Sequence, residues 1–70
     1  MNAIYTPTAT RFAIASHPLY PEICVVRRVV ADQFMYVAAV GGYTADPVEA
    51  RQYDQPDTAA CVARMLNSGL

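Results

Sequence analysis

The sequence predicts an α+β fold, in which an antiparallel sheet of three to four strands carries one C-terminal helix packed on one face. Two apolar runs of strand length, residues 22–31 and 34–40, are rich in β-branched or aromatic side chains. The glycine pair Gly41-Gly42 follows the second run and is typical of a hairpin turn. A helical spacing of apolar residues appears near the C-terminus. These observations place a hairpin sheet before a helix.

Size and composition indicate one small domain. The chain has 70 residues, of which 54% are hydrophobic and 16% are charged. A domain of this size buries about 60% of the surface that its unfolded chain exposes. We therefore expect a single domain over residues 1–70, with residues 1–10 loosely ordered because threonine is frequent there. The large apolar fraction favours binding or self-association.

The first predicted strand covers residues 11–16. Its residues alternate in polarity, with Phe12 and Ile14 on one face. Two X-Pro pairs within residues 17–21 end the strand, because proline removes a ladder donor and holds its predecessor extended. We expect a loop there.

The next two predicted strands form the centre of the sheet. Residues 22–31 are rich in β-branched side chains, and the neighbours Arg27 and Arg28 must point to opposite faces. A short turn at residues 31–33 leads into residues 34–40, which are apolar at every position. A strand of this kind needs cover on both faces.

The two faces of the strand over residues 34–40 are assigned by side-chain type. We expect Met35, Val37 and Ala39 to lie under the helix, because alanine allows close approach. Tyr36 then lies on the opposite, less completely covered face, since a tyrosine hydroxyl prefers water or a partner. The cover on that face could come from the N-terminal third of the chain, from a second copy or from a partner.

Turn and capping residues predict the path after the sheet. Residues 43–44 can begin a returning strand after the glycine pair. Asp46 as N-cap, Pro47 at the first helical position and Glu49 as the capping-box partner predict a single helical turn.

The main helix is predicted over residues 55–67, with Asp54 as its N-cap and Gly69 in the left-handed position after its end. The residues that we expect on its apolar face are Thr58, Cys61, Val62, Met65 and Leu66.

Residue types that carry catalysis are sparse. His17 is the single histidine, and we expect it to be exposed in a loop with Ser16 pointing to the other side of the chain. Cys24 and Cys61 lack the paired spacing of zinc ligands, and no glycine-rich phosphate loop occurs. We therefore expect no enzyme activity, with no catalytic residue, no cofactor and no metal site.

The N-terminus and the hydropathy pattern predict a cytoplasmic protein without membrane contact. The first basic residue is Arg11, so the charged-then-apolar pattern of a signal peptide is absent. The longest apolar run is far shorter than the ~20 residues that span a bilayer. In a reducing compartment Cys24 and Cys61 are expected to be free thiols.

The charge pattern disfavours nucleic-acid binding. The net charge is −1, and it arises from five arginines and six carboxylates with no lysine and no long run of either sign. A nucleic-acid-binding domain usually shows a basic patch or stripe, so direct contact with nucleic acid is not expected.

Tyrosine usage favours a protein-binding surface. Five tyrosines occur without tryptophan, and tyrosine and arginine are enriched at the energetic centres of protein interfaces. An apolar central strand adds to the surface that a partner could cover. The residues that we expect at such an interface are Tyr20, Arg27, Tyr36, Tyr43 and Arg51.

The C-terminal half resembles a known kind of protein. The runs G-G-Y-T-A-D (residues 41–46) and A-R-Q-Y-D (residues 50–54), followed by a helix with Ala59 and Ala60, resemble short hairpin-plus-helix proteins of phages and mobile elements, among them some phage anti-CRISPR proteins. The resemblance implies a phage-encoded inhibitor that acts in the bacterial cytoplasm and sterically blocks a host CRISPR-Cas effector subunit. Those families share no fixed functional residues, so no site residue follows from it.

Two other functions fit the same residues. A homodimeric, self-assembling module would bury the second sheet face in a copy of itself. A small DNA-associated regulator would bind with an affinity that falls steeply with salt.

Overall fold

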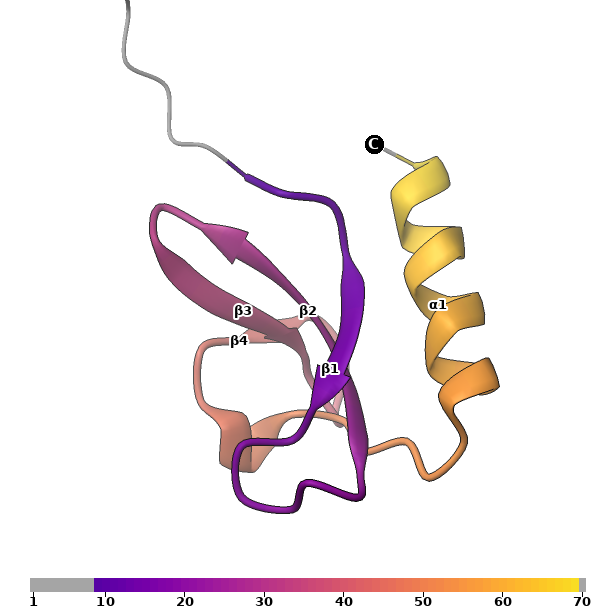
Figure 1. Ribbon diagram of the computed structural model, residues 1–70. Helices are drawn as coiled ribbons and strands as arrows, with labels where there is room; N and C mark the ends of the chain where they lie inside the picture. Colours follow the sequence, from indigo (N-terminus) through magenta and orange to yellow (C-terminus); the bar gives the residue numbers. More distant parts are fainter. Residues whose placement is uncertain (1–8, 70) are drawn as a thin grey trace, which may run out of the picture.

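Among the described residues, four antiparallel strands form one sheet, with neighbours in the order of the chain, and one α-helix packs against it (Figure 1). The computed structural model describes residues 9–69. Its elements are β1 (Ala13–Ser16), β2 (Cys24–Val30), β3 (Gln33–Val37), β4 (Tyr43–Thr44), the 3₁₀ helix η1 (Pro47–Glu49) and α1 (Pro56–Ser68). This arrangement confirms the predicted α+β fold and its C-terminal helix.

The chain joins the sheet before β1 begins. Ala9 bridges to Val30, and the N–H of Thr10 donates to the carbonyl of Val29 over 3.0 Å. The predicted loosely ordered segment over residues 1–10 lies otherwise outside the described residues. Its last two residues are held against the end of β2.

A two-residue turn joins β2 to β3. Ala31 and Asp32 have φ values of 52° and 66°, and Val30 pairs with Gln33 on either side of them. Positive φ at both central positions is typical of a type I′ turn, whose twist matches that of the flanking strands. The predicted turn over residues 31–33 is therefore one residue shorter, because Gln33 belongs to β3.

The strand predicted over residues 34–40 ends early, at Val37. The N–H of Ala38 donates to the carbonyl of Gly42 over 3.0 Å, so the chain bends into a loop before the glycine pair. Gly41 and Gly42, with φ values of 107° and 70°, form the second half of that loop and not a two-residue hairpin. Ala39, expected under the helix, is exposed there.

The apolar seam of α1 differs from the predicted one. Ala59 and Ala63 are buried with Phe12, Val26 and Tyr53, and the half-buried side chains that pack against them from the helix are Val62 and Leu66. The predicted face also contained Thr58, Cys61 and Met65, which are exposed. The small alanines let the helix backbone approach the sheet closely, and this turns these three side chains outward, while the predicted Val62 and Leu66 still pack against the cluster.

The ends of α1 also differ from the prediction. Its N-cap is Gln55 and not Asp54, and the Gln55 side chain makes no capping hydrogen bond. Gly69 has a φ of −91°, so it does not adopt the left-handed conformation that its position predicts.

At η1 the predicted N-cap and single turn are confirmed, because Asp46 Oδ1 accepts from the N–H of Val48 over 2.9 Å. The capping box is wrong, because the N–H of Asp46 donates to Thr44 Oγ1 and not to Glu49.

The face of the sheet opposite α1 is covered by the chain itself. A second core cluster contains Val25, Tyr36 and Ala50. The segment after η1 runs beside the end of β3, where the N–H of Arg51 donates to the carbonyl of Val37 over 2.8 Å. Tyr36 is on the predicted face but is 3% exposed, so the expectation that its hydroxyl end lies on open surface is wrong, whereas Phe34 on the same face is 45% exposed.

His17 is buried, contrary to the expectation of an exposed loop histidine, and is 1% exposed. Its Nδ1 accepts from the N–H of Leu19 over 3.0 Å, and its Nε2 lies 3.0 Å from the carbonyl of Pro47. Since Nδ1 is an acceptor, Nε2 carries the proton and donates to that carbonyl. The neutral imidazole thus ties the loop before β2 to η1.

Cys24 is half-buried and Cys61 is exposed, and both are free thiols. Within residues 9–69, no helix combines the length and apolar character that crossing a bilayer requires.

Candidate functional site

The structure separates the residues that sequence reasoning selected for a protein interface. Arg27 and Tyr36 are register partners on β2 and β3, on the face opposite α1. Tyr43 pairs with Val37, which packs in the cluster beneath α1, so Tyr43 lies on the other face. Burial of Tyr36 leaves little of its ring for a partner.

Two other residues of the predicted set each form a contact of their own. The ring of Tyr20 lies 5.0 Å from that of His17 in the loop before β2, and Tyr20 is 48% exposed. The Arg51 guanidinium lies 5.9 Å from the ring centroid of Tyr53, after η1. The five predicted residues therefore belong to several surfaces.

The first arginine–aromatic contact lies on the face opposite α1. The guanidinium carbon of Arg27 is 3.9 Å from the ring centroid of Phe34, within the range of a favourable cation–π contact. Phe34 is 45% exposed, and its ring is 6.4 Å from that of Tyr36 at an angle of 48°. Arg27 is thus held on an aromatic ring that remains open to a partner.

The second contact lies on the α1 face. The guanidinium carbon of Arg28 is 4.8 Å from the ring centroid of Phe12, and its Nε donates to the carbonyl of Thr10 over 3.0 Å. The rings of Phe12 and Tyr43 stack at 5.6 Å and 25°. Phe12 precedes β1 and Tyr43 begins β4, so the curl of the sheet brings its two edges together here.

We call these five residues, Phe12, Arg27, Arg28, Phe34 and Tyr43, the arginine–aromatic surface. Phe12, 5% exposed, is its buried support beneath Arg28, and the other four are at least partly exposed. The surface is built around the β2–β3 hairpin, whose turn points away from α1 (Figure 1). Sequence reasoning identified Arg27 and Tyr43 but missed the other three. The adjacent arginines signal one cation on each face of a strand, but only the register shows which ring each one meets.

No protein-family model, curated protein or solved structure matches this chain. The site's own geometry is therefore what bears on function.

The arginine–aromatic surface suits recognition. A guanidinium is planar, permanently charged and able to donate several hydrogen bonds to carboxylates or carbonyls. Exposed aromatic rings beside it bury apolar area on binding. In the part of the chain that the structure describes, no three histidine, cysteine or acidic side chains gather as metal ligands.

Proposed function

We propose that this chain is a small protein-binding domain that acts without catalysis and docks through its arginine–aromatic surface. The observation that carries the proposal is the pair of adjacent arginines, Arg27 and Arg28, each placed over an aromatic ring on opposite faces of one hairpin. Arginine and aromatic residues dominate the energetic centres of interfaces. A guanidinium already placed on a ring loses less conformational freedom when a partner binds.

The positions of the two contacts indicate the shape of the partner. Because they lie on opposite faces of the hairpin, a partner that uses both must contact both faces. The proposed docking mode is therefore insertion of the β2–β3 turn end into a cleft. Phe34, which is 45% exposed and lies next to the turn, would supply apolar contact area there, and Tyr43, 53% exposed at the other end of β3, would contact the rim of the cleft.

A narrower form of the proposal adds the resemblance of residues 41–46 and 50–54 to phage anti-CRISPR proteins. In this form the partner is a CRISPR-Cas effector subunit in the bacterial cytoplasm, and the chain inhibits it by occupying its cleft. Steric inhibition needs no catalytic group, and residue types that carry catalysis are sparse in this sequence.

A pull-down from a bacterium with an active CRISPR system tests the proposal. Tagged wild-type protein and the variant R27A/R28A are used as baits, and captured proteins are identified by mass spectrometry. We expect an effector subunit to be enriched on the wild type and lost on R27A/R28A. The matched control R51A removes an exposed arginine outside the surface and should capture as much as the wild type.

Two outcomes of that experiment are informative against the proposal. Equal capture by wild type and R27A/R28A would remove the arginine–aromatic surface as the docking site. Capture of a different host protein that depends on Arg27 and Arg28 would keep the binding function and reject the CRISPR form.

The two alternative functions lose support from the geometry. Self-assembly was motivated by an uncovered sheet face, and the chain itself covers the part of this face around Val25 and Tyr36, which leaves Phe34 exposed. DNA binding needs cations along one face, whereas Arg27 and Arg28 stack on rings of opposite faces.

A further inference from the structure

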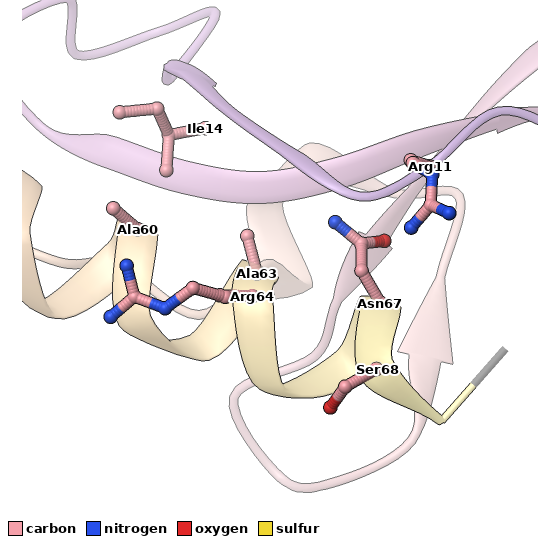
Figure 2. Close-up of a pocket in the computed structure, with 7 residues that line it drawn as sticks. All are labelled: Arg11, Ile14, Ala60, Ala63, Arg64, Asn67 and Ser68. Carbon is pink, nitrogen blue, oxygen red and sulfur yellow. The ribbon is translucent and has the colours of Figure 1, made fainter.

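A groove of about 580 Å³ lies between β1 and the C-terminal half of α1 (Figure 2). Ile14 from β1 and the helix residues Ala60 and Ala63 form its apolar part. Arg11 and Arg64, both exposed, also line it. The groove uses none of the residues of the arginine–aromatic surface.

The outer edge of β1 borders this groove and has backbone groups available for pairing. The N–H of Phe12 donates to Asn67 Oδ1 over 2.7 Å, and Asn67 Nδ2 donates to the carbonyl of Phe12 over 2.9 Å. Both backbone groups of Phe12 therefore point away from β2. In an antiparallel ladder the direction alternates, so the N–H and C=O of Ile14 and Ser16 point the same way.

The Asn67 side chain shows what this edge accepts. Its amide offers one donor and one acceptor to Phe12, as the peptide group of a neighbouring strand would. Asn67 thus pairs with the outward-pointing N–H and C=O of Phe12 at the edge of β1. The next outward-pointing backbone groups, those of Ile14 and Ser16, have no partner among the described residues.

We propose that β1 and this groove bind an extended, acidic peptide segment of a partner protein as an added strand. The backbone of the peptide pairs with Ile14 and Ser16, which is the β-augmentation mode of peptide recognition. One of its side chains, small and apolar, lies over Ile14. An acidic side chain two positions away, on the Ser16 side, faces Arg64, whose guanidinium lies beside Ala60 at that end of the groove (Figure 2).

The spacing of this motif follows from strand geometry. Residues i and i+2 of a strand share a face and lie about 7 Å apart. The side chains that enter the groove therefore alternate with ones that do not. The recognised pattern is an apolar residue and an acidic residue separated by one residue of any type.

Charge selects an acidic peptide over a second copy of this chain. β1 has the sequence A-I-A-S and contains no carboxylate. Pairing β1 with the same strand of another copy would therefore bring no carboxylate of that strand to Arg64. A carboxylate of an acidic peptide is complementary to the Arg64 guanidinium, and Arg11 adds to the positive charge of the groove.

Selection from a displayed library of short random peptides tests this proposal, with the wild type and the variant R11E/R64E as parallel targets. We expect the wild type to enrich peptides with the apolar-x-acidic pattern. R11E/R64E should bind those peptides at least about tenfold more weakly and prefer peptides with lysine or arginine at the acidic position. R27A/R28A should behave as the wild type, which separates this groove from the docking surface proposed above.

Two measurements on an enriched peptide test strand addition itself. Amide hydrogen exchange at Ile14 and Ser16 should slow on binding, because their N–H groups gain acceptors. A peptide methylated at the alternate backbone nitrogens that face β1 should lose binding, since those nitrogens can no longer donate to the carbonyls of β1. Equal enrichment on R11E/R64E, no enrichment on the wild type, or binding that survives methylation would each overturn the proposal.

Discussion

At the scale of single residues, His17 shows how a loop is held by one buried side chain. Its two ring nitrogens join the loop before β2 to η1 through Leu19 and Pro47. No other polar or charged residue is buried to this extent among residues 9–69. The side chain therefore acts as a structural bridge, and the expected exposed loop position is wrong.

We expect His17→Phe to lower the free energy of unfolding by about 2–4 kcal/mol, because a ring of similar size leaves the Leu19 N–H and the Pro47 carbonyl without partners. Urea denaturation measures this effect. Leu19→Ala is the control, since that side chain is 56% exposed and should cost less than about 1 kcal/mol. A His17→Phe variant as stable as the wild type would show that the two hydrogen bonds contribute nothing net.

The turn residue Ala31 is a second local determinant, because it holds a positive φ without being glycine or asparagine. We expect Ala31→Asn to raise the free energy of unfolding by about 0.5–1 kcal/mol, since asparagine tolerates this conformation better. Thermal unfolding measures the gain. Ala39→Asn, in an exposed loop where φ is not positive, should give no increase, and the same gain at both positions would contradict the explanation from φ.

At the scale of elements, α1 is oriented by its alanines. Ala59 is 0% exposed and faces the sheet, while Cys61 on the same helix is exposed. The helical spacing alone is compatible with several rotations of the helix, and sequence reasoning chose the one with the larger side chains inward. Close packing favours the small residues here.

We expect Ala59→Leu to destabilise the protein by about 1–3 kcal/mol, because added methylenes overpack the contact with Phe12 and Val26. Cys61→Leu places the same side chain on the solvent side and should change stability by less than about 0.5 kcal/mol. Chemical denaturation of both variants compares them directly. If Cys61→Leu were the more destabilising of the two variants, the result would instead support the helix face predicted from the sequence, with Cys61 towards the sheet.

At the scale of the whole molecule, one chain supplies the cover for both faces of its sheet. α1 covers one face over Val26, and the segment around Ala50 covers the other over Val25. The arginine–aromatic surface and the groove beside β1 remain as two separate regions for partners. They share no residue, so each can be changed without the other.

We expect a monomer whose sedimentation coefficient does not change with concentration, because the part of the second sheet face around Val25 and Tyr36 is covered from within the chain. Sedimentation velocity over a wide concentration range measures this. A dimer that dissociates on dilution would instead favour the self-assembling alternative, and its sensitivity to R11E/R64E would show whether the edge of β1 forms the contact.

Local patterns were sufficient for part of the candidate site. Alternation placed Arg27 and Arg28 on opposite faces, and side-chain type singled out Tyr43. Phe34 was part of the apolar run, but nothing in the sequence marks it as the ring beneath Arg27. That pairing depends on the register of β2 with β3, which sets a residue's cross-strand neighbours.

Local sequence patterns predict the kinds of element and their order, because alternation, turn residues and proline-led helix starts act over a few residues. What covers each sheet face, which side of α1 is buried and the enclosure of His17 follow only from the folded domain. These features depend on contacts between residues distant in the chain, such as Phe12 with Asn67 and His17 with Pro47. Such contacts form only when the register and the packing of the whole domain are settled.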